Sequence, residues 1–236
     1  MGAAGTGPAD PRVPSIKGLG ASKVLANTRH LDIYRAQIGL LDKSWQTQTL
    51  GHARTMDGIE MAAVMLGTTP EGLRDRPVLL GIINTNSPLQ LDIPMAEGLI
   101  AMAAHGQVVA ITPFTLSGAM APVTLAGALT LQHAEALAGI VLTQIVRPGV
   151  PVMYGAFTSN VDMRSGSPAF GTPEYTKAAL ASGQLARHIR VPFRSSNVTA
   201  ANEVDAQAAY ESQMALWGAL MGGAHLLEHA AGWMHG

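Results

Sequence analysis

Short apolar runs alternate with longer amphipathic segments along this chain. A strand with one solvent-exposed face alternates apolar and polar residues, and these runs do not. Continuous apolar runs are typical of strands in a parallel sheet that is covered on both faces. We expect strands at residues 45–50, 78–83, 108–112, 150–154, 191–194 and 224–230, the first of them weak because Gln and Thr fill most of it. Helical spacing of apolar residues predicts helices over residues 30–43, 57–66, 95–104, 121–146, 174–188 and 202–221.

Strands and helices that alternate in this way favour right-handed parallel crossovers and an α/β fold. A (β/α)8 barrel of the TIM type fits the pattern best, but eight units need roughly 250 residues. The chain has 236 residues and about six such units. We therefore expect an incomplete barrel, which is either completed by another copy or is a piece of a longer protein.

The first residues, 1–25, are rich in Gly, Ala and Pro and lack the apolar core of a signal peptide. We expect them to form a disordered arm, residues 26–236 to form the barrel domain, and the protein to be cytoplasmic.

The segment 121–146 is apolar enough to suggest a membrane span. It contains Gln132, His133, Glu135 and Gln144, however, and each of these polar groups would be costly in a bilayer. We expect a buried helix of a soluble protein and no membrane partner.

Composition excludes several classes of function. The net charge of -1 argues against nucleic acid, since such binding rests on clustered Lys and Arg. The absence of Cys excludes a thiolate zinc site and a cysteine nucleophile. Only 13% of the residues are charged, so we expect large faces to be covered by other subunits, most simply in a homo-oligomer.

A long polar segment follows the strand predicted at 150–154. It is longer than a plain connector and ends at Thr172 and Pro173, which read as the N-cap and first residue of a helix. Because α/β proteins handle ligands where parallel strands end, we expect the site to centre on this segment.

The histidines and glycines give weaker signals. His225, His229 and His235 are close in sequence, but His225 and His229 face one metal only at helical spacing, and a strand is an equally good prediction there. No H-E-x-x-H, G-x-G-x-x-G or Walker sequence occurs, so we expect neither a metal nor a nucleotide.

Five motifs carry a resemblance to a known family. They are INTNSPL at 83–89, ITPFTLSGAMAPVT at 111–124, YGAFTSNVDM at 154–163, RSSN at 194–197 and DAQAAYES at 205–212. Together they make the chain, from about residue 30 to 233, similar to the trimethylamine methyltransferase family. This family includes members without pyrrolysine that act on glycine betaine and related quaternary amines.

The resemblance implies a TIM barrel that moves a methyl group from a methylated amine to the cobalt of a corrinoid. The corrinoid would be carried by a separate small protein, with none bound tightly by this chain. Family members are about twice as long, which implies that the first strands, an N-terminal helical region and a segment after Trp233 are missing. The sequence contains no pyrrolysine, which favours a quaternary amine over trimethylamine; we take the equivalent position to lie within 155–160.

Demethylation of a quaternary ammonium needs a cation held in place rather than a general base, and aromatic faces hold cations. A carboxylated, betaine-like substrate also needs an arginine or neutral donors. The candidate substrate-binding residues are Tyr154, Phe157, Asn160, Asp162, Arg164, Asn84, Asn86, Arg194, Ser195, Asn197 and Trp233.

Four of the candidates have a plainer alternative. Tyr154 and Phe157 fit ordinary packing, Arg194 fits an ion pair with Asp162 or Glu228, and Asp162 fits a solvated loop. The catalytic residues stay unassigned. A rival function is a truncated, non-catalytic barrel that acts as an oligomeric scaffold or binds a ligand or a corrinoid protein. An unrelated TIM-barrel lyase is the third reading, but its phosphate loop would have to be built from Gly222 and Gly223 alone.

Overall fold

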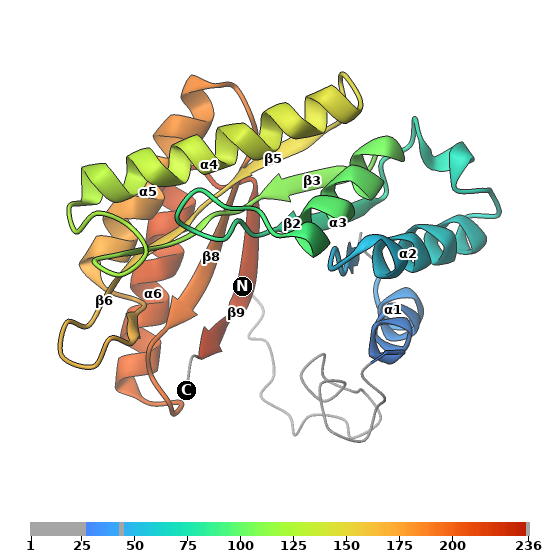
Figure 1. The fold of residues 1–236 in the computed structure, drawn as a ribbon. Helices are drawn as coiled ribbons and strands as arrows, with labels where there is room; N and C mark the ends of the chain where they lie inside the picture. The colour runs from blue at the N-terminus through green and yellow to red at the C-terminus, as the bar shows by residue number, and fades with distance from the viewer. Residues whose placement is uncertain (1–26, 43–44, 235–236) are drawn as a thin grey trace.

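The computed structural model describes residues 27–42 and 45–234, so the arm expected at residues 1–25 lies outside the described residues. Its main element is a six-stranded sheet in the order β1-β2-β3-β5-β8-β9, in which all neighbouring strands are parallel (Figure 1). The strands are β1 Trp45–Thr47, β2 Leu79–Ile83, β3 Val108–Ile111, β5 Val152–Gly155, β8 Phe193–Thr199 and β9 Leu226–Met234.

Helices connect the strands, and each packs against the next helix along the chain. They are α1 Arg29–Leu40, α2 His52–Met65, α3 Ile93–Ala104, α4 Leu125–Val146, α5 Pro173–His188 and α6 Ala206–Met221, with a 3₁₀ turn at Glu71–Leu73. Gln46 on β1 and Glu228 on β9 belong to opposite ends of the sheet, yet both line one pocket. The sheet is therefore curled, and the predicted α/β fold, an incomplete barrel of about six units, is confirmed.

A second, smaller sheet lies in the segments that follow β3 and β5. Its strands, β4 Phe114–Ser117, β6 Phe157–Val161 and β7 Pro168–Ala169, pair in the order β4-β6-β7. We predicted loops at 113–120 and 155–171, and that prediction was wrong. The two segments become strands because they pair with each other, with Phe114 opposite Phe157, and this partnership is not visible in either segment alone.

Several boundaries also differ from the prediction. The strand expected at 191–194 begins at Phe193 and continues through buried Ser195, Ser196 and Asn197 to Thr199. The helix expected from residue 57 begins at 52, and the one expected from 202 begins at 206. The helix start at Thr172 is confirmed, since its side chain accepts a hydrogen bond from the backbone N–H of Tyr175.

The long helix α4 lies over β3 and β5 (Figure 1). Its length and composition would suit a membrane span, but its polar groups have partners inside the protein. Gln132 donates to the hydroxyls of Tyr154 and Ser182 at 3.1 and 2.9 Å. Gln144 donates to the carbonyl of Val150 at 3.0 Å and also accepts from the adjacent turn. These contacts join the polar groups of α4 to the rest of the protein.

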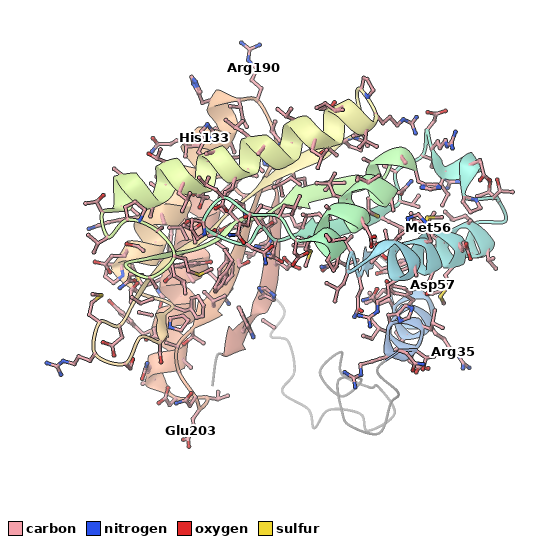
Figure 2. All side chains as sticks on the ribbon, in the orientation of Figure 1. Arg35, Met56, Asp57, His133, Arg190 and Glu203 are labelled. Atoms are coloured by element: carbon pink, nitrogen blue, oxygen red, sulfur yellow. The ribbon has the colours of Figure 1, made fainter. Side chains whose placement is uncertain are left out.

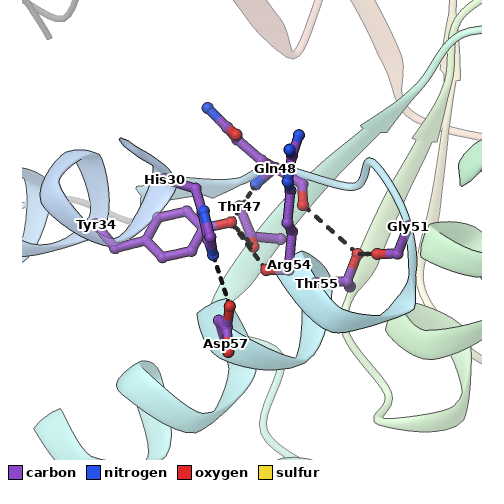
Figure 3. A network of polar contacts seen from close by, with 8 residues as sticks. All are labelled: His30, Tyr34, Thr47, Gln48, Gly51, Arg54, Thr55 and Asp57. Atoms are coloured by element: carbon purple, nitrogen blue, oxygen red, sulfur yellow. Dashed lines mark hydrogen bonds and ion pairs between the residues drawn. The ribbon is translucent and has the colours of Figure 1, made fainter. Parts of the chain in front are cut away.

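The N-terminal helices are fixed by a polar network around Tyr34 (Figure 3). The Tyr34 hydroxyl donates to the carbonyl of Arg54 at 3.1 Å and accepts from the Thr47 hydroxyl and the backbone N–H of Gln48. His30 contacts the Asp57 carboxylate at 2.6 Å. Residues from α1, β1 and α2 thus share one junction, which holds the first strand at the edge of the sheet.

Candidate functional site

A large pocket lies at the ends of the parallel strands, where the connecting loops begin. Figure 2 places Arg190, which precedes β8, and Glu203, which follows it, at opposite ends of the molecule, so the strand direction can be followed there. The pocket has a volume of about 750 Å³, a size suited to a small ligand. It is lined by Gln46, Ile82, Asn84, Thr85, Asn86, Ser87, Phe114, Met120, Phe157, Arg194, Glu228, His229 and Trp233.

The pocket brings together five of the eleven predicted site residues: Asn84, Asn86, Phe157, Arg194 and Trp233. These residues come from the loop after β2, from β6, from β8 and from β9, and are far apart in sequence. The curled sheet gathers them in one hollow.

Three other predicted residues lie in the strands but do not line this pocket. Tyr154 is fully buried and faces α4, where its hydroxyl contacts Gln132 and His133. Burial raises its pKa to about 12. Ser195 is buried within β8, and the Asn197 amide donates to the Ser212 hydroxyl at 2.7 Å.

The remaining three predicted residues lie in β6 and in the turn that follows it. Asn160 lines a separate cavity of about 220 Å³ and accepts a hydrogen bond from the Thr172 hydroxyl. Asp162 and Arg164 are exposed. The Asp162 carboxylate accepts from the backbone N–H of Arg164 and the hydroxyl of Ser165, and these hydrogen bonds lower the pKa of Asp162. The carboxylate of Asp162 therefore stabilises the turn that contains it.

Aromatic side chains form one wall of the pocket. Phe157 stacks on Phe114 with ring centroids 5.2 Å apart and lies 5.9 Å from Trp233. Phe170 packs behind them, fully buried, at 5.4 Å from Phe157. Phe114 was missed in the sequence because its segment was read as a loop. An aromatic wall of this kind attracts quaternary ammonium groups.

An ion pair provides the charge in the pocket. Arg194 is only 3% exposed and forms an ion pair with the carboxylate of Glu228, one of the two partners expected for it. Its Nε and Nη1 have no hydrogen-bond partner among the residues that the structure describes. Burial lowers the pKa of Arg194 to about 10, which leaves it charged at neutral pH. Two nitrogens of this buried cation therefore carry hydrogen-bond donors that the described residues do not use.

His229 also lines the pocket, although we considered it only as a metal ligand. It has a left-handed backbone (φ 56°) and lies where the pairing of β8 with β9 shifts register. Its ring is 5.3 Å from that of Trp233. Desolvation and the nearby charge of Arg194 lower the pKa of His229 to about 4, so the imidazole is neutral at pH 7.

The metal hypothesis receives no support from the described residues, which include no group of three or more His, Asp or Glu that could hold an ion. His225 accepts a hydrogen bond from the backbone N–H of Phe193, and His229 lies in strand β9, not in a helix. His235 lies outside the described residues.

The sequence matches known proteins over most of its length. It is 42% identical over 205 residues to a glycine betaine methyltransferase of Desulfitobacterium hafniense, a match that covers 86% of this chain and 43% of the relative. It is 35% identical over 159 residues to a proline betaine:corrinoid methyltransferase of Eubacterium limosum (67% and 33%). It is 33% identical over 149 residues to a trimethylamine methyltransferase of Methanosarcina barkeri (63% and 30%).

The matched region is less than half the length of each of these relatives. The sequence profile of the trimethylamine methyltransferases matches residues 17–236, nearly the whole of the 236 residues. The chain therefore belongs to the trimethylamine methyltransferase family.

Proposed function

We propose that this chain forms the substrate-binding part of a methyltransferase that moves a methyl group from a betaine-like quaternary amine to the cobalt of a corrinoid. The observation that carries the proposal is the pocket at the strand ends, which is lined by an aromatic wall and by a buried arginine with two unpaired nitrogens among the described residues. Membership of a methyltransferase family supports it, as do the relatives that are betaine methyltransferases.

The two ends of a betaine need different partners. The ammonium group suits the faces of Phe157 and Trp233, where a desolvated cation gains about 2 kcal/mol. The carboxylate suits the guanidinium of Arg194, whose Nε and Nη1 have no partner among the described residues and can each donate to one carboxylate oxygen. The amides of Asn84 and Asn86 offer neutral donors on the same pocket. This pairing of charge and aromatic surface favours a zwitterion over a simple alkylamine.

The chemical step requires little from the protein beyond alignment. The N–CH₃ bond breaks and its electron pair stays on nitrogen, which leaves as a neutral tertiary amine. Reduced cobalt on the acceptor supplies the electron pair of the new bond to the methyl group. The pocket residues hold the ammonium so that one methyl group faces the acceptor, and they exclude water from it.

The acceptor and assembly belong to the same proposal. We place the corrinoid on a separate partner protein and the reaction in the cytoplasm, where reduced cobalt can be maintained. Exposed Tyr210, Trp217, Leu220 and Met221 on α6 support association of the chain with other copies of itself.

The test mixes the purified chain with cob(I)alamin and, in parallel, glycine betaine, choline or trimethylamine. We expect methylcobalamin, followed by its absorbance, with the betaine in preference to the other two amines. Transfer from none of them would contradict a catalytic role for this chain. Calorimetric binding of glycine betaine without transfer would support the rival function, a non-catalytic ligand-binding barrel.

A further inference from the structure

A buried carboxylate on α4 is joined to a single loop. Glu135 is 3% exposed, and the loop after β2 donates three hydrogen bonds to it. The hydroxyls of Thr85 and Ser87 donate to its Oε2 at 2.5 and 2.8 Å. The backbone N–H of Leu89 donates to its Oε1 at 2.7 Å. Because a buried carboxylate is stable only when its oxygens are satisfied, Glu135 and this loop depend on each other.

This loop separates two cavities. Residues 84–87 line the large pocket of the proposed substrate site. Leu89 and Leu91 line a smaller, mainly apolar cavity of about 220 Å³, which Glu135 also lines. The loop therefore has free space on the side that faces α4, and its distance from that helix is set by the hydrogen bonds to Glu135.

The backbone of the loop is held under strain at the same point. Leu89 has φ 54°, a left-handed conformation that is unfavourable for a side chain with a Cβ, and it is 69% exposed. Such a conformation persists where neighbouring contacts impose it. The amide of Leu89 is the one that donates to Glu135, so this hydrogen bond is one of the contacts that hold the conformation.

Movement at Leu89 is passed to the pocket by a short closed turn. The backbone N–H of Asn86 donates to the carbonyl of Gln90 at 2.8 Å, and the N–H of Gln90 donates back at 3.1 Å. The side-chain oxygen of Asn86 also accepts from the backbone N–H of Asp92. Asn86 therefore moves with the segment that Glu135 holds.

We propose that Glu135 is a positioning residue of the substrate site, which fixes Asn86 on the pocket wall without touching the substrate. The effect on substrate rests on the proposed function, whereas the anchoring of the loop does not. The position of the carboxylate matters here, and its charge does not.

Binding of glycine betaine, measured by calorimetry, separates position from charge. Glu135→Gln removes the charge but keeps an oxygen for the Leu89 amide, while its NH₂ group donates to the two hydroxyls. Glu135→Asp keeps the charge but withdraws it by one methylene. We expect Gln to bind like the wild type, and Asp and Glu135→Ala to raise Kd by about five- and ten-fold. Weak binding by Gln with normal binding by Asp would overturn the proposal.

Two comparisons guard against a merely structural effect. Glu97→Ala removes an exposed carboxylate on the neighbouring helix α3. This carboxylate accepts a hydrogen bond from the backbone N–H of His52, and its loss should leave Kd unchanged. Asn86→Ala, alone and combined with Glu135→Ala, completes a double-mutant cycle. Non-additive effects on Kd would show that Glu135 acts through Asn86. Fully additive effects would contradict the proposal.

Amide hydrogen exchange tests the anchor without any ligand. In Glu135→Asp we expect the amides of Leu89 and Gln90 to exchange at least ten-fold faster, while those of β3 keep their protection. Unchanged exchange at Leu89 would refute the anchor. If the wild type binds no quaternary amine, the proposed function fails, and this measurement still decides whether Glu135 holds the loop.

Discussion

Two buried polar clusters lie on opposite faces of the same sheet, and they differ in how completely their groups are bonded. Under α4, the amide of Gln132 contacts Tyr154 and Ser182 and accepts from the Thr158 hydroxyl at 2.5 Å. In the pocket, Arg194 is equally buried but leaves Nε and Nη1 unpaired among the described residues. The first cluster is closed, because its buried polar groups bond to one another. The second has hydrogen-bond donors that the described residues do not use.

The difference separates stability from binding. A fully satisfied buried network stiffens and specifies the fold, because any group that it released would be costly. An unsaturated buried cation lowers stability unless something completes it. We therefore expect damage under α4 to affect folding and damage in the pocket to affect ligand binding. Substitutions in each cluster test this distinction.

Loss of Arg194 should have the largest effect. Arg194→Met removes the proposed carboxylate partner and leaves the partly buried carboxylate of Glu228 unpaired. We expect Kd for glycine betaine to rise by about 100-fold or more, and the free energy of unfolding to fall by about 3–5 kcal/mol. Calorimetry and urea unfolding measure the two effects.

The matched control removes both charges. Arg194→Met combined with Glu228→Leu replaces the buried pair with apolar side chains, which is often neutral for stability. We expect unfolding to return near the wild-type value while binding stays lost. A double variant that binds normally would show that Arg194 serves the fold alone.

Damage to the closed cluster should have a smaller effect, and on folding only. Gln132→Leu leaves the hydroxyls of Tyr154, Thr158 and Ser182 without their shared partner, so we expect a loss of about 2 kcal/mol in the free energy of unfolding. Kd for glycine betaine should not change. Weakened binding at unchanged stability would reverse the comparison.

Local patterns in the sequence were enough to predict the main sheet and its helices. Continuous apolar runs predicted the buried parallel strands, and Thr172 with Pro173 predicted the start of α5. The polar residues of α4 predicted a helix that packs inside the protein, and Gln132 and Glu135 are buried and bonded there.

Features that arise from pairing between distant segments could not be predicted. The small sheet exists because β4 and β6 align with each other, which brings Phe114 into the aromatic wall. A register shift between β8 and β9 directs His229 and Trp233 toward the pocket, and no local pattern marks it. Tyr154 lies in a buried strand, where alternation does not reveal which face a side chain takes, and it faces α4.

The smallest predicted effect concerns His229. Its pKa is lowered from about 6.5 in an unfolded chain to about 4, so between these values the unfolded state binds one proton more than the folded state. Stability from this group is therefore complete above about pH 6.5 and is lost as the pH falls toward 4. His229→Asn removes the titration and tolerates the left-handed backbone. We expect the urea midpoint of the wild type to fall further between pH 7.5 and pH 5 than that of the variant. The other histidines are present in both proteins, so equal losses would show that the imidazole of His229, a residue that is exposed at the pocket, is solvated like a surface side chain.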